Sequence, residues 1–326
     1  MADPLCRDVA WSRTVRLPIL GVPTTFATNS DAVLGAIEET YGHWTPFTPP
    51  AGCVCDKTPT IRIAVHDHLH APDPAPAFSY RLPDPTRLFI AWNGGVGVAD
   101  TLRLESVAYA TEELVSRRLE FVEAVLEPLT LFLLGALDRE PLHATAVFRD
   151  GAAILLAGPS GAGKSTLTYA AWRHGFSFLA EEPVYVQMRP ALRVWGRRPR
   201  LHLPLEARAH FPELRDVPAL RLPSGKTKMV VRLTSRIQPY ADRAGICLLP
   251  PGSRETSPTL ERIPAEEVLA ELGRDLESGF DLFAGTIHER LAAIAAAGAW
   301  RLHVGRSPAD ALPLLERIAA ELAGPA

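Results

Sequence analysis

The chain has 326 residues, of which 47% are hydrophobic and 22% charged, and its formal net charge is −3. This length accommodates two domains of globular composition. The charge provides no basic field for a nucleic acid, and no run of about 18 apolar residues is present to cross a membrane. The first residues lack the apolar core of a signal peptide, and the four cysteines (Cys6, Cys53, Cys55 and Cys247) lack the spacing of a disulfide framework. We therefore expect a cytoplasmic protein that binds neither nucleic acid nor membrane.

Residues 1–137 predict a smaller N-terminal α+β domain. A helix is expected after Ser30 or Asp31, strands over 60–69 and 87–100, and a long helix over 111–137 that bends at Pro128. These elements carry no recognisable chemical motif. The expected role of this domain is therefore to present a substrate or to form a homo-oligomer.

Residues 138–326 predict an α/β domain with a mixed sheet. Two strands over 142–157, joined by a turn at Asp150-Gly151, lead into a glycine-rich loop and then a helix that ends at Gly175. The stretch 176–188 has the composition of a strand interrupted by two glutamates, and further short strands and helices follow. Because the strands do not alternate regularly with helices, a mixed sheet is favoured over a repeated βαβ arrangement.

The glycine-rich loop, "GPSGAGKS", matches the phosphate-binding loop (P-loop) pattern G-x-x-x-x-G-K-[ST]. Glycines allow backbone N–H groups to converge on phosphate oxygens, a lysine reaches the outer phosphates, and a serine hydroxyl contacts Mg²⁺. The helix that follows adds its N-terminal dipole. We therefore expect ATP and Mg²⁺ as ligands, with the nucleotide-binding residues Gly158, Ser160, Gly161, Ala162, Gly163, Lys164, Ser165 and Thr166.

Two adjacent carboxylates, Glu181 and Glu182, follow the apolar stretch "FSFLA". A carboxylate at the end of a buried strand beside a P-loop normally holds Mg²⁺, and a second one can take a proton from an attacking hydroxyl. We expect their strand to pair with the strand that precedes the P-loop. The alternative is a strand that reaches the surface and exposes two charges.

Lysine is rare in this chain, since only Lys57, Lys164, Lys226 and Lys228 occur among 34 basic residues. A compact ammonium group fits against a phosphate in a way that a planar guanidinium does not. Lys226 and Lys228 follow a glycine turn and alternate to one face of the next strand. This pattern indicates a phosphate contact, and the alternative is a surface hairpin.

The ordered set "LHATAV", "ILLAGPSGAGKSTL" and "HGFSFLAEEPVYV" resembles the HPr kinase/phosphorylase superfamily over roughly residues 138–326. In that family a P-loop domain, similar to phosphoenolpyruvate carboxykinase, transfers the γ-phosphoryl group of ATP to a serine hydroxyl with Mg²⁺. The resemblance implies that Glu181 is the catalytic base, oriented by His143, with Lys164 at the phosphates. Ser165 and Glu182 would hold Mg²⁺. The family has aspartates where this chain has glutamates, which leaves open how Glu181 and Glu182 divide these roles.

The resemblance also bears on the substrate. The chain has no convincing counterpart of the C-terminal loop with which HPr kinases bind their protein substrate, so HPr is not the expected acceptor. In length and layout the chain is similar to kinases of lasso-peptide clusters, which phosphorylate a serine of a precursor peptide. A peptide or protein serine is therefore the expected acceptor. A small-molecule kinase and a non-transferring nucleotide-binding regulator or ATPase are the alternatives.

Overall fold

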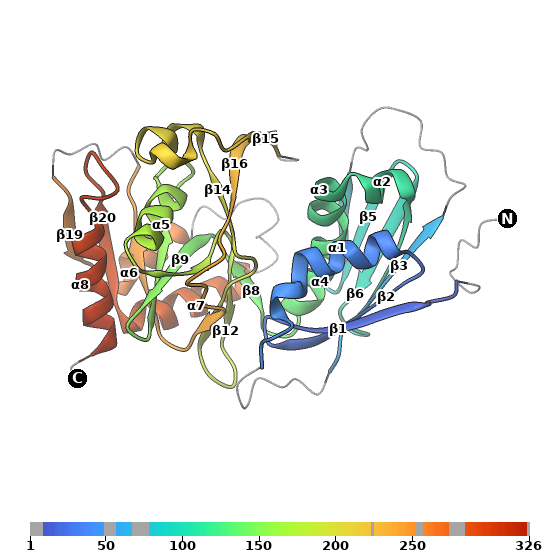
Figure 1. The fold of residues 1–326 in the computed structure, drawn as a ribbon. Coiled ribbons are helices and arrows are strands. Elements are labelled where there is room, and N and C mark those ends of the chain that lie inside the picture. The colour runs from blue at the N-terminus through green and yellow to red at the C-terminus, as the bar shows by residue number, and fades with distance from the viewer. Residues whose placement is uncertain are drawn as a thin grey trace. The chain divides into compact units, whose positions relative to one another are not determined.

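The computed structural model describes residues 9–48, 57–66, 78–222, 225–251, 257–273 and 284–324. Cys6, Cys53 and Cys55 lie outside these ranges, as do the first residues of the predicted lysine hairpin, Pro223 and Ser224. The chain forms two compact units, Met1–Arg139 and Glu140–Ala326 (Figure 1). The boundary between them lies close to the position between 137 and 138 that the sequence predicts.

The described residues of the first unit form one seven-stranded mixed sheet in the order β1-β2-β3-β7-β6-β5-β4. Its elements are β1 (Arg13–Ile19), β2 (Val22–Thr28), α1 (Asp31–Tyr41), a 3₁₀ turn (Gly42–Trp44), β3 (Thr60–His66), β4 (Ser79–Asp84), β5 (Arg87–Trp92), β6 (Gly95–Asp100), β7 (Glu105–Thr111), α2 (Glu112–Ser116), α3 (Arg118–Phe121), a π-helical turn (Val122–Leu126) and α4 (Glu127–Gly135).

Helices α1 and α4 pack on this sheet, where β3 contributes the buried side chains of Ile61 and Ile63. The expected cap of α1 is present, because the Ser30 hydroxyl accepts from the N–H of Val33. The long helix expected over 111–137 is divided instead. Its break falls at Arg117, which has a non-helical backbone, whereas Pro128 lies in the first turn of α4. The π-helical turn runs directly into α4, so the chain is already helical before Pro128, and the carbonyl oxygen of Ala124, four residues earlier, accepts from the Tyr80 hydroxyl instead.

The described residues of the second unit form a mixed α/β domain with three sheets. Its elements are β8 (Glu140–Leu142), β9 (Ala144–Arg149), β10 (Ala152–Ala157), α5 (Lys164–Arg173), β11 (Ser177–Ala180), β12 (Val184–Gln187), β13 (Arg193–Trp195), β14 (Arg200–Leu203), 3₁₀ turns (Leu205–Ala209 and Pro212–Leu214), β15 (Ala219–Arg221), β16 (Thr227–Arg232), β17 (Tyr240–Ala241), β18 (Ala244–Leu248), β19 (Thr259–Arg262), α6 (Ala265–Leu272), α7 (Ala284–Ala297), β20 (Ala299–His303) and α8 (Leu312–Ala323).

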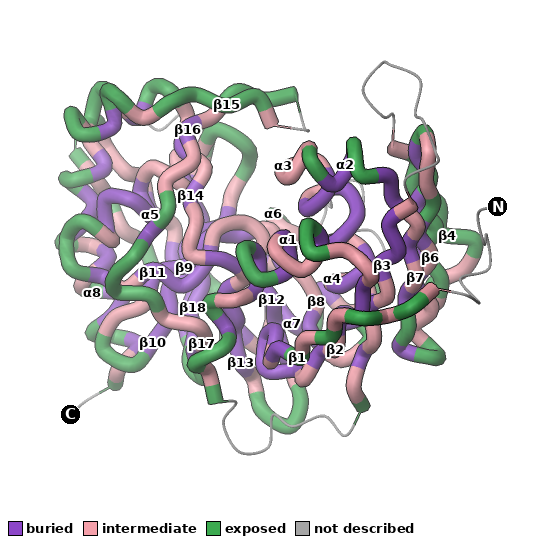
Figure 2. Tube along the Cα trace, turned by 45° about the vertical axis from the view of Figure 1, so that its right-hand side comes forward, coloured by how far each residue is buried: buried purple, intermediate pink, exposed green. Residues whose placement is uncertain are grey.

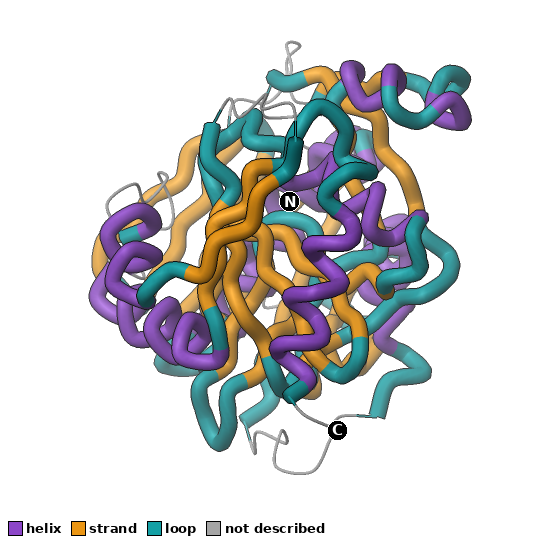
Figure 3. Tube along the Cα trace, turned by 90° about the vertical axis from the view of Figure 1, so that its left-hand side faces the viewer, coloured by secondary structure: helices purple, strands orange, loops and turns teal. Residues whose placement is uncertain are grey.

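The main sheet of this unit has the order β11-β9-β10-β18-β20-β19. Strand β10 runs parallel to β18 and antiparallel to β9, and all its residues are buried (Figure 2). Because side chains alternate along a strand, Ile154 and Leu156 pack on one face with α5 and α8, and Leu155 packs on the other with α7. The last helix crosses in front of this sheet in Figure 3. Within the described ranges, no helix is both long and apolar enough to cross a membrane.

The stretch 176–188 is a strand interrupted by the two glutamates, as predicted, and its two halves join different sheets. Strand β11 is the edge of the main sheet, whereas β12 belongs to a second sheet in the order β17-β13-β12-β8. The expectation that β11 pairs with the strand preceding the P-loop is wrong. Strand β9 lies between β11 and β10, because the tight hairpin with β10 already occupies that edge.

Candidate functional site

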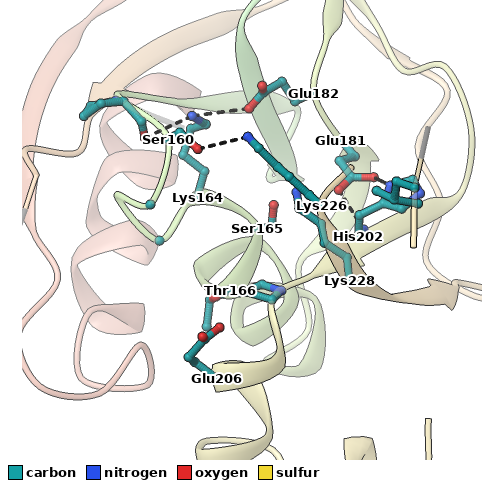
Figure 4. A pocket seen from close by; sticks show the side chains of 15 residues that line it. Ser160, Lys164, Ser165, Thr166, Glu181, Glu182, His202, Glu206, Lys226 and Lys228 are labelled. Atoms are coloured by element: carbon teal, nitrogen blue, oxygen red, sulfur yellow. Dashed lines mark hydrogen bonds and ion pairs between the residues drawn. The ribbon is translucent and has the colours of Figure 1, made fainter. Parts of the chain in front are cut away.

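Three strand ends meet at one edge of the main sheet. Strand β9 begins opposite the end of β10, since Ala144 pairs with Ala157. Strand β11 is antiparallel to β9 and so runs parallel to β10, with Ala180 opposite Ala146. The residues before β9, after β10 and after β11 therefore share this edge. They are His143, the P-loop and the two glutamates, and Figure 4 shows the loop and the glutamates.

The P-loop has a backbone that only glycine adopts readily. Gly158, Gly161 and Gly163 have φ values of 146°, 89° and 92°. At Gly158 an added Cβ would lie 2.3 Å from the carbonyl oxygen of Leu249, so the loop also passes very close to the end of β18. Helix α5 begins at Lys164 without a side-chain cap. Its first N–H groups have no partner within the helix and favour an anion such as a phosphate.

Lys164 is the most buried charged group of the site, with 6% of its side chain exposed. Its Nζ donates to the carbonyl oxygen of Gly158 at 2.6 Å and lies 3.3 Å from Oε2 of Glu182. It also lies 3.3 Å from Nε2 of His143. The lysine is thus held beside the loop by a carbonyl and a carboxylate, at the start of α5.

His143 contacts Glu182, with 2.6 Å between Nε2 and Oε1. Burial raises the pKa of Glu182, but the hydrogen bond from His143 and the charge of Lys164 outweigh it, so the net pKa lies below its ordinary value. The site therefore holds Glu182 as a carboxylate. The expectation that His143 orients Glu181 is not met, because the turn after β11 directs the second glutamate, not the first, at the histidine.

Glu181 is held by a residue that the sequence analysis did not select, His202 on β14. The backbone N–H of His202 donates to Oε1 of Glu181 at 2.6 Å, and its ring Nδ1 bonds to Oε2. Figure 4 shows this carboxylate directed at His202. The only local signal is alternation: Leu201 and Leu203 are fully buried, which turns His202 away from their core.

These groups line a pocket of about 630 Å³, within the range of small-molecule sites. Its walls are the P-loop, the turn after β11, the end of β14 and the β15–β16 hairpin. The lining residues are Pro159, Ser160, Gly161, Gly163, Lys164, Ser165, Thr166, Glu181, Glu182, His202, Pro204, Glu206, Leu222, Lys226 and Lys228.

Most residues selected from the sequence are brought together in this pocket. Lys226 and Lys228 both reach it, and Nζ of Lys226 lies 3.5 Å from Oγ of Ser160. Three selected residues are not part of the lining. Gly158 and Ala162 are half-buried residues of the loop, and Ala162 packs on the apolar cluster below it. His143 reaches the site through Glu182 and Lys164.

The donor atoms of the pocket suit a hard cation. Ser165 and Glu182 offer a hydroxyl and a carboxylate oxygen at the uncapped start of α5. In the described part of the chain, no group of three His, Cys, Asp or Glu side chains is arranged to hold a metal by itself. This pattern fits Mg²⁺, which usually takes one or two protein ligands together with substrate phosphates and water.

Comparisons with known proteins place few constraints on this chain. No family model matches it, and no curated protein matches it. Among solved structures, it is similar to the HPr(Ser) kinase/phosphatase from Coxiella burnetii, with 10% sequence identity and a TM-score of 0.26. The similarity covers 34% of this chain and 65% of the kinase/phosphatase. The function is therefore derived from the residues of the pocket.

Proposed function

We propose that this protein is an ATP-dependent kinase that transfers the γ-phosphoryl group to a serine hydroxyl of a peptide or protein. The proposal rests on one observation: a P-loop and two carboxylates line the same pocket, and each carboxylate has its own partner. Holding Mg²⁺ beside the loop requires only one carboxylate. A second carboxylate, held apart from the loop lysine, provides a proton acceptor for a hydroxyl nucleophile.

The P-loop side of the pocket would bind the nucleotide. The N–H groups of the loop and of the first turn of α5 are suited to the phosphates, and Lys164 to the outer phosphate oxygens. Lys226 and Lys228 would add positive charge from the β15–β16 hairpin. Ser165 and Glu182 would hold Mg²⁺, which when bound supplies neutralisation of phosphate charge. Each oxygen of Glu182 has a second lone pair beyond its contact with His143 or Lys164.

Glu181 would take the proton in the transfer step. The acceptor hydroxyl oxygen forms a bond to the γ-phosphorus, and the bond between that phosphorus and the bridging oxygen breaks. ADP leaves with the electron pair of that bond, and the hydroxyl proton passes to the carboxylate of Glu181. Lysines around the phosphates would stabilise the charge that shifts to the leaving oxygen.

The acceptor that we propose is a serine of a ribosomally made natural-product precursor peptide, met in the cytoplasm. The first unit, Met1–Arg139, would present this peptide or join two copies of the chain. All the residues that line the pocket belong to the second unit. The first unit is therefore available for another task, which supports this role. A small metabolite with a hydroxyl group is the competing acceptor.

The test incubates the protein with Mg·ATP and the short peptides encoded beside its gene, and mass spectrometry measures the products. Addition of one phosphoryl group to a serine is the expected result, absent with Lys164→Ala and reduced to a slow residual rate with Glu181→Gln. Phosphorylation of a metabolite instead would assign the small-molecule reaction. Consumption of ATP with no modified acceptor would overturn the kinase proposal in favour of an ATPase or regulator.

A further inference from the structure

Glu181 is held at both of its oxygens by a single residue. Oε1 accepts from the backbone N–H of His202, and Oε2 bonds to Nδ1 of the same residue. Only 10% of the Glu181 side chain and 11% of the His202 side chain are exposed. A glutamate side chain has considerable rotamer freedom when unconstrained. Here two hydrogen bonds from one residue fix the position of its carboxylate.

The support behind this pair is rigid. His202 lies on β14, which pairs with β16 through Leu201 opposite Val231 and Leu203 opposite Met229. Leu201, Leu203 and Met229 are fully buried in one apolar cluster with residues of α5. The ring of His202 is therefore carried by a strand that pairs with β16 along one side and packs on α5, the helix that begins at the P-loop.

The surroundings of the ring indicate its tautomer. Nε2 of His202 is buried and has no hydrogen-bond partner in the part of the chain that the structure describes. A proton on that atom would be a buried donor without an acceptor, which is costly. A ring with its proton on Nδ1 avoids this cost, and Nδ1 then donates to Glu181. The carboxylate of Glu181 thus receives two hydrogen bonds and keeps its other lone pairs for a ligand.

We propose that His202 is a positioning residue for the reaction: it holds the Glu181 carboxylate where that group accepts the proton of the acceptor hydroxyl. This inference rests on the proposed kinase function. His202 acts only through Glu181, which is the group that lies at the reacting hydroxyl. Because a small displacement of a reacting group lowers the rate strongly, loss of the Nδ1 donor should reduce kcat and leave the KM for ATP unchanged.

The test compares two substitutions of His202 that differ in where they place a donor. An asparagine side chain carries its amide nitrogen near the position of Nδ1, whereas a glutamine carries it near that of Nε2. We expect His202→Asn to retain most of the activity, and His202→Gln to lose kcat by about 10- to 100-fold with the KM for ATP unchanged. His210→Gln, at an exposed histidine outside the pocket, is the matched control.

A double substitution shows whether the two residues act as one unit. In the Glu181→Gln background, His202→Gln should cause no further loss of kcat, because the group that it positions is gone. Equal activity of His202→Gln and the wild type, or full additivity of the two losses, would overturn the positioning role while leaving the kinase function in place. A wild-type protein that modifies no acceptor would overturn the kinase function, and the role of His202 with it.

Variants that fail to fold are distinguished by two measurements. The thermal midpoint and the affinity for ATP should match those of the wild type in His202→Asn and His202→Gln. If the thermal midpoint of His202→Gln falls by several degrees, the comparison is made with His202→Asn alone. That variant must then keep kcat within about threefold of the wild type, a smaller change than a displaced reacting group causes. A larger loss of kcat in a folded His202→Asn protein contradicts the proposal.

Discussion

Nε2 of His143 lies 2.6 Å from Oε1 of Glu182, although β9 begins after one of them and β11 ends before the other. The contact joins the residue before β9 to the turn after β11, at the edge of the sheet where the pocket lies. The same carboxylate lies 3.3 Å from Lys164 at the start of α5. Glu182 is therefore the point at which three segments of the second unit meet.

The first prediction concerns the stability of Glu182→Gln as a function of pH. Burial raises the pKa of Glu182, but hydrogen bonding by His143 and the charge of Lys164 bring its folded-state pKa below the ordinary value of 4.5. Its ionised form therefore stabilises the fold above pH 4.5, and this contribution is lost as the pH falls through the lower, folded-state pKa. At pH 7 the variant should be less stable than the wild type by about 1 kcal/mol.

Urea denaturation of both proteins between neutral and acid pH measures this difference. The two free energies of unfolding should converge as the pH falls below the ordinary range of a glutamate. A difference that stays constant with pH would show that Glu182 contributes through its shape and not through its charge.

The second prediction concerns the affinity for ATP of Lys164 variants. Lys164→Ala removes a nearly buried ammonium group from the P-loop, and the affinity should fall by at least about 30-fold, equivalent to about 2 kcal/mol. Lys164→Arg should not restore it, because a planar guanidinium does not replace a compact ammonium at this position. Isothermal titration with a non-hydrolysable ATP analogue measures both. Affinity equal to that of the wild type in Lys164→Ala would place the nucleotide elsewhere.

The third prediction separates steric contact from backbone strain at two glycines. Gly158 has a φ of 146°, and a Cβ there would lie 2.3 Å from the carbonyl oxygen of Leu249. Gly151 has a φ of 85°, with nothing within 4 Å of such a Cβ. Gly158→Ala should therefore destabilise the protein by on the order of 3 kcal/mol, and Gly151→Ala by about 1 kcal/mol. Thermal unfolding of the two variants side by side checks this order, and equal shifts would contradict it.

The fourth prediction concerns the dependence of nucleotide binding on Mg²⁺. Ser165 lines the pocket in the first turn of α5, where its hydroxyl would be a ligand of the metal. Ser165→Ala should raise the Mg²⁺ concentration needed for half-maximal activity, and Ser165→Thr should keep the wild-type value because the hydroxyl remains. Titration of Mg²⁺ at a fixed ATP concentration distinguishes them. Identical curves for all three proteins would remove Ser165 from the metal site.

Local patterns in the sequence predict much of the second unit. Asp150 and Gly151 indicate the turn between β9 and β10, and both have the positive φ that a tight hairpin requires. The glycines and Lys164 indicate the P-loop between a strand and a helix, which is where it lies. The interruption at Glu181 and Glu182 indicates where β11 ends. Each of these features depends on residues that are neighbours in the chain.

Pairings between distant segments are not predictable in this way. The neighbour of Glu181 is His202, which β14 brings from another sheet, and no spacing in the sequence links the two residues. Strand β9 lies between β10 and β11 because its tight hairpin with β10 fills the place beside β10. The sequence does not show which strand fills that place. Which of the two glutamates contacts His143 depends on the geometry of the turn after β11, and here it is Glu182. Side-chain pairing across sheets has no signature in a single sequence.

The two-residue turn at Asp150-Gly151 has a consequence at the opposite end of its hairpin. A two-residue loop permits a single alignment of β9 with β10, in which Arg149 faces Ala152 and Ala144 faces Ala157. That alignment decides how far His143 lies from the first residue of the P-loop. One inserted residue in the turn would shift β9 by a step and reverse the side on which each of its side chains points. The length of a surface turn thus sets the spacing of His143 and the P-loop, although it lies a full strand away from them.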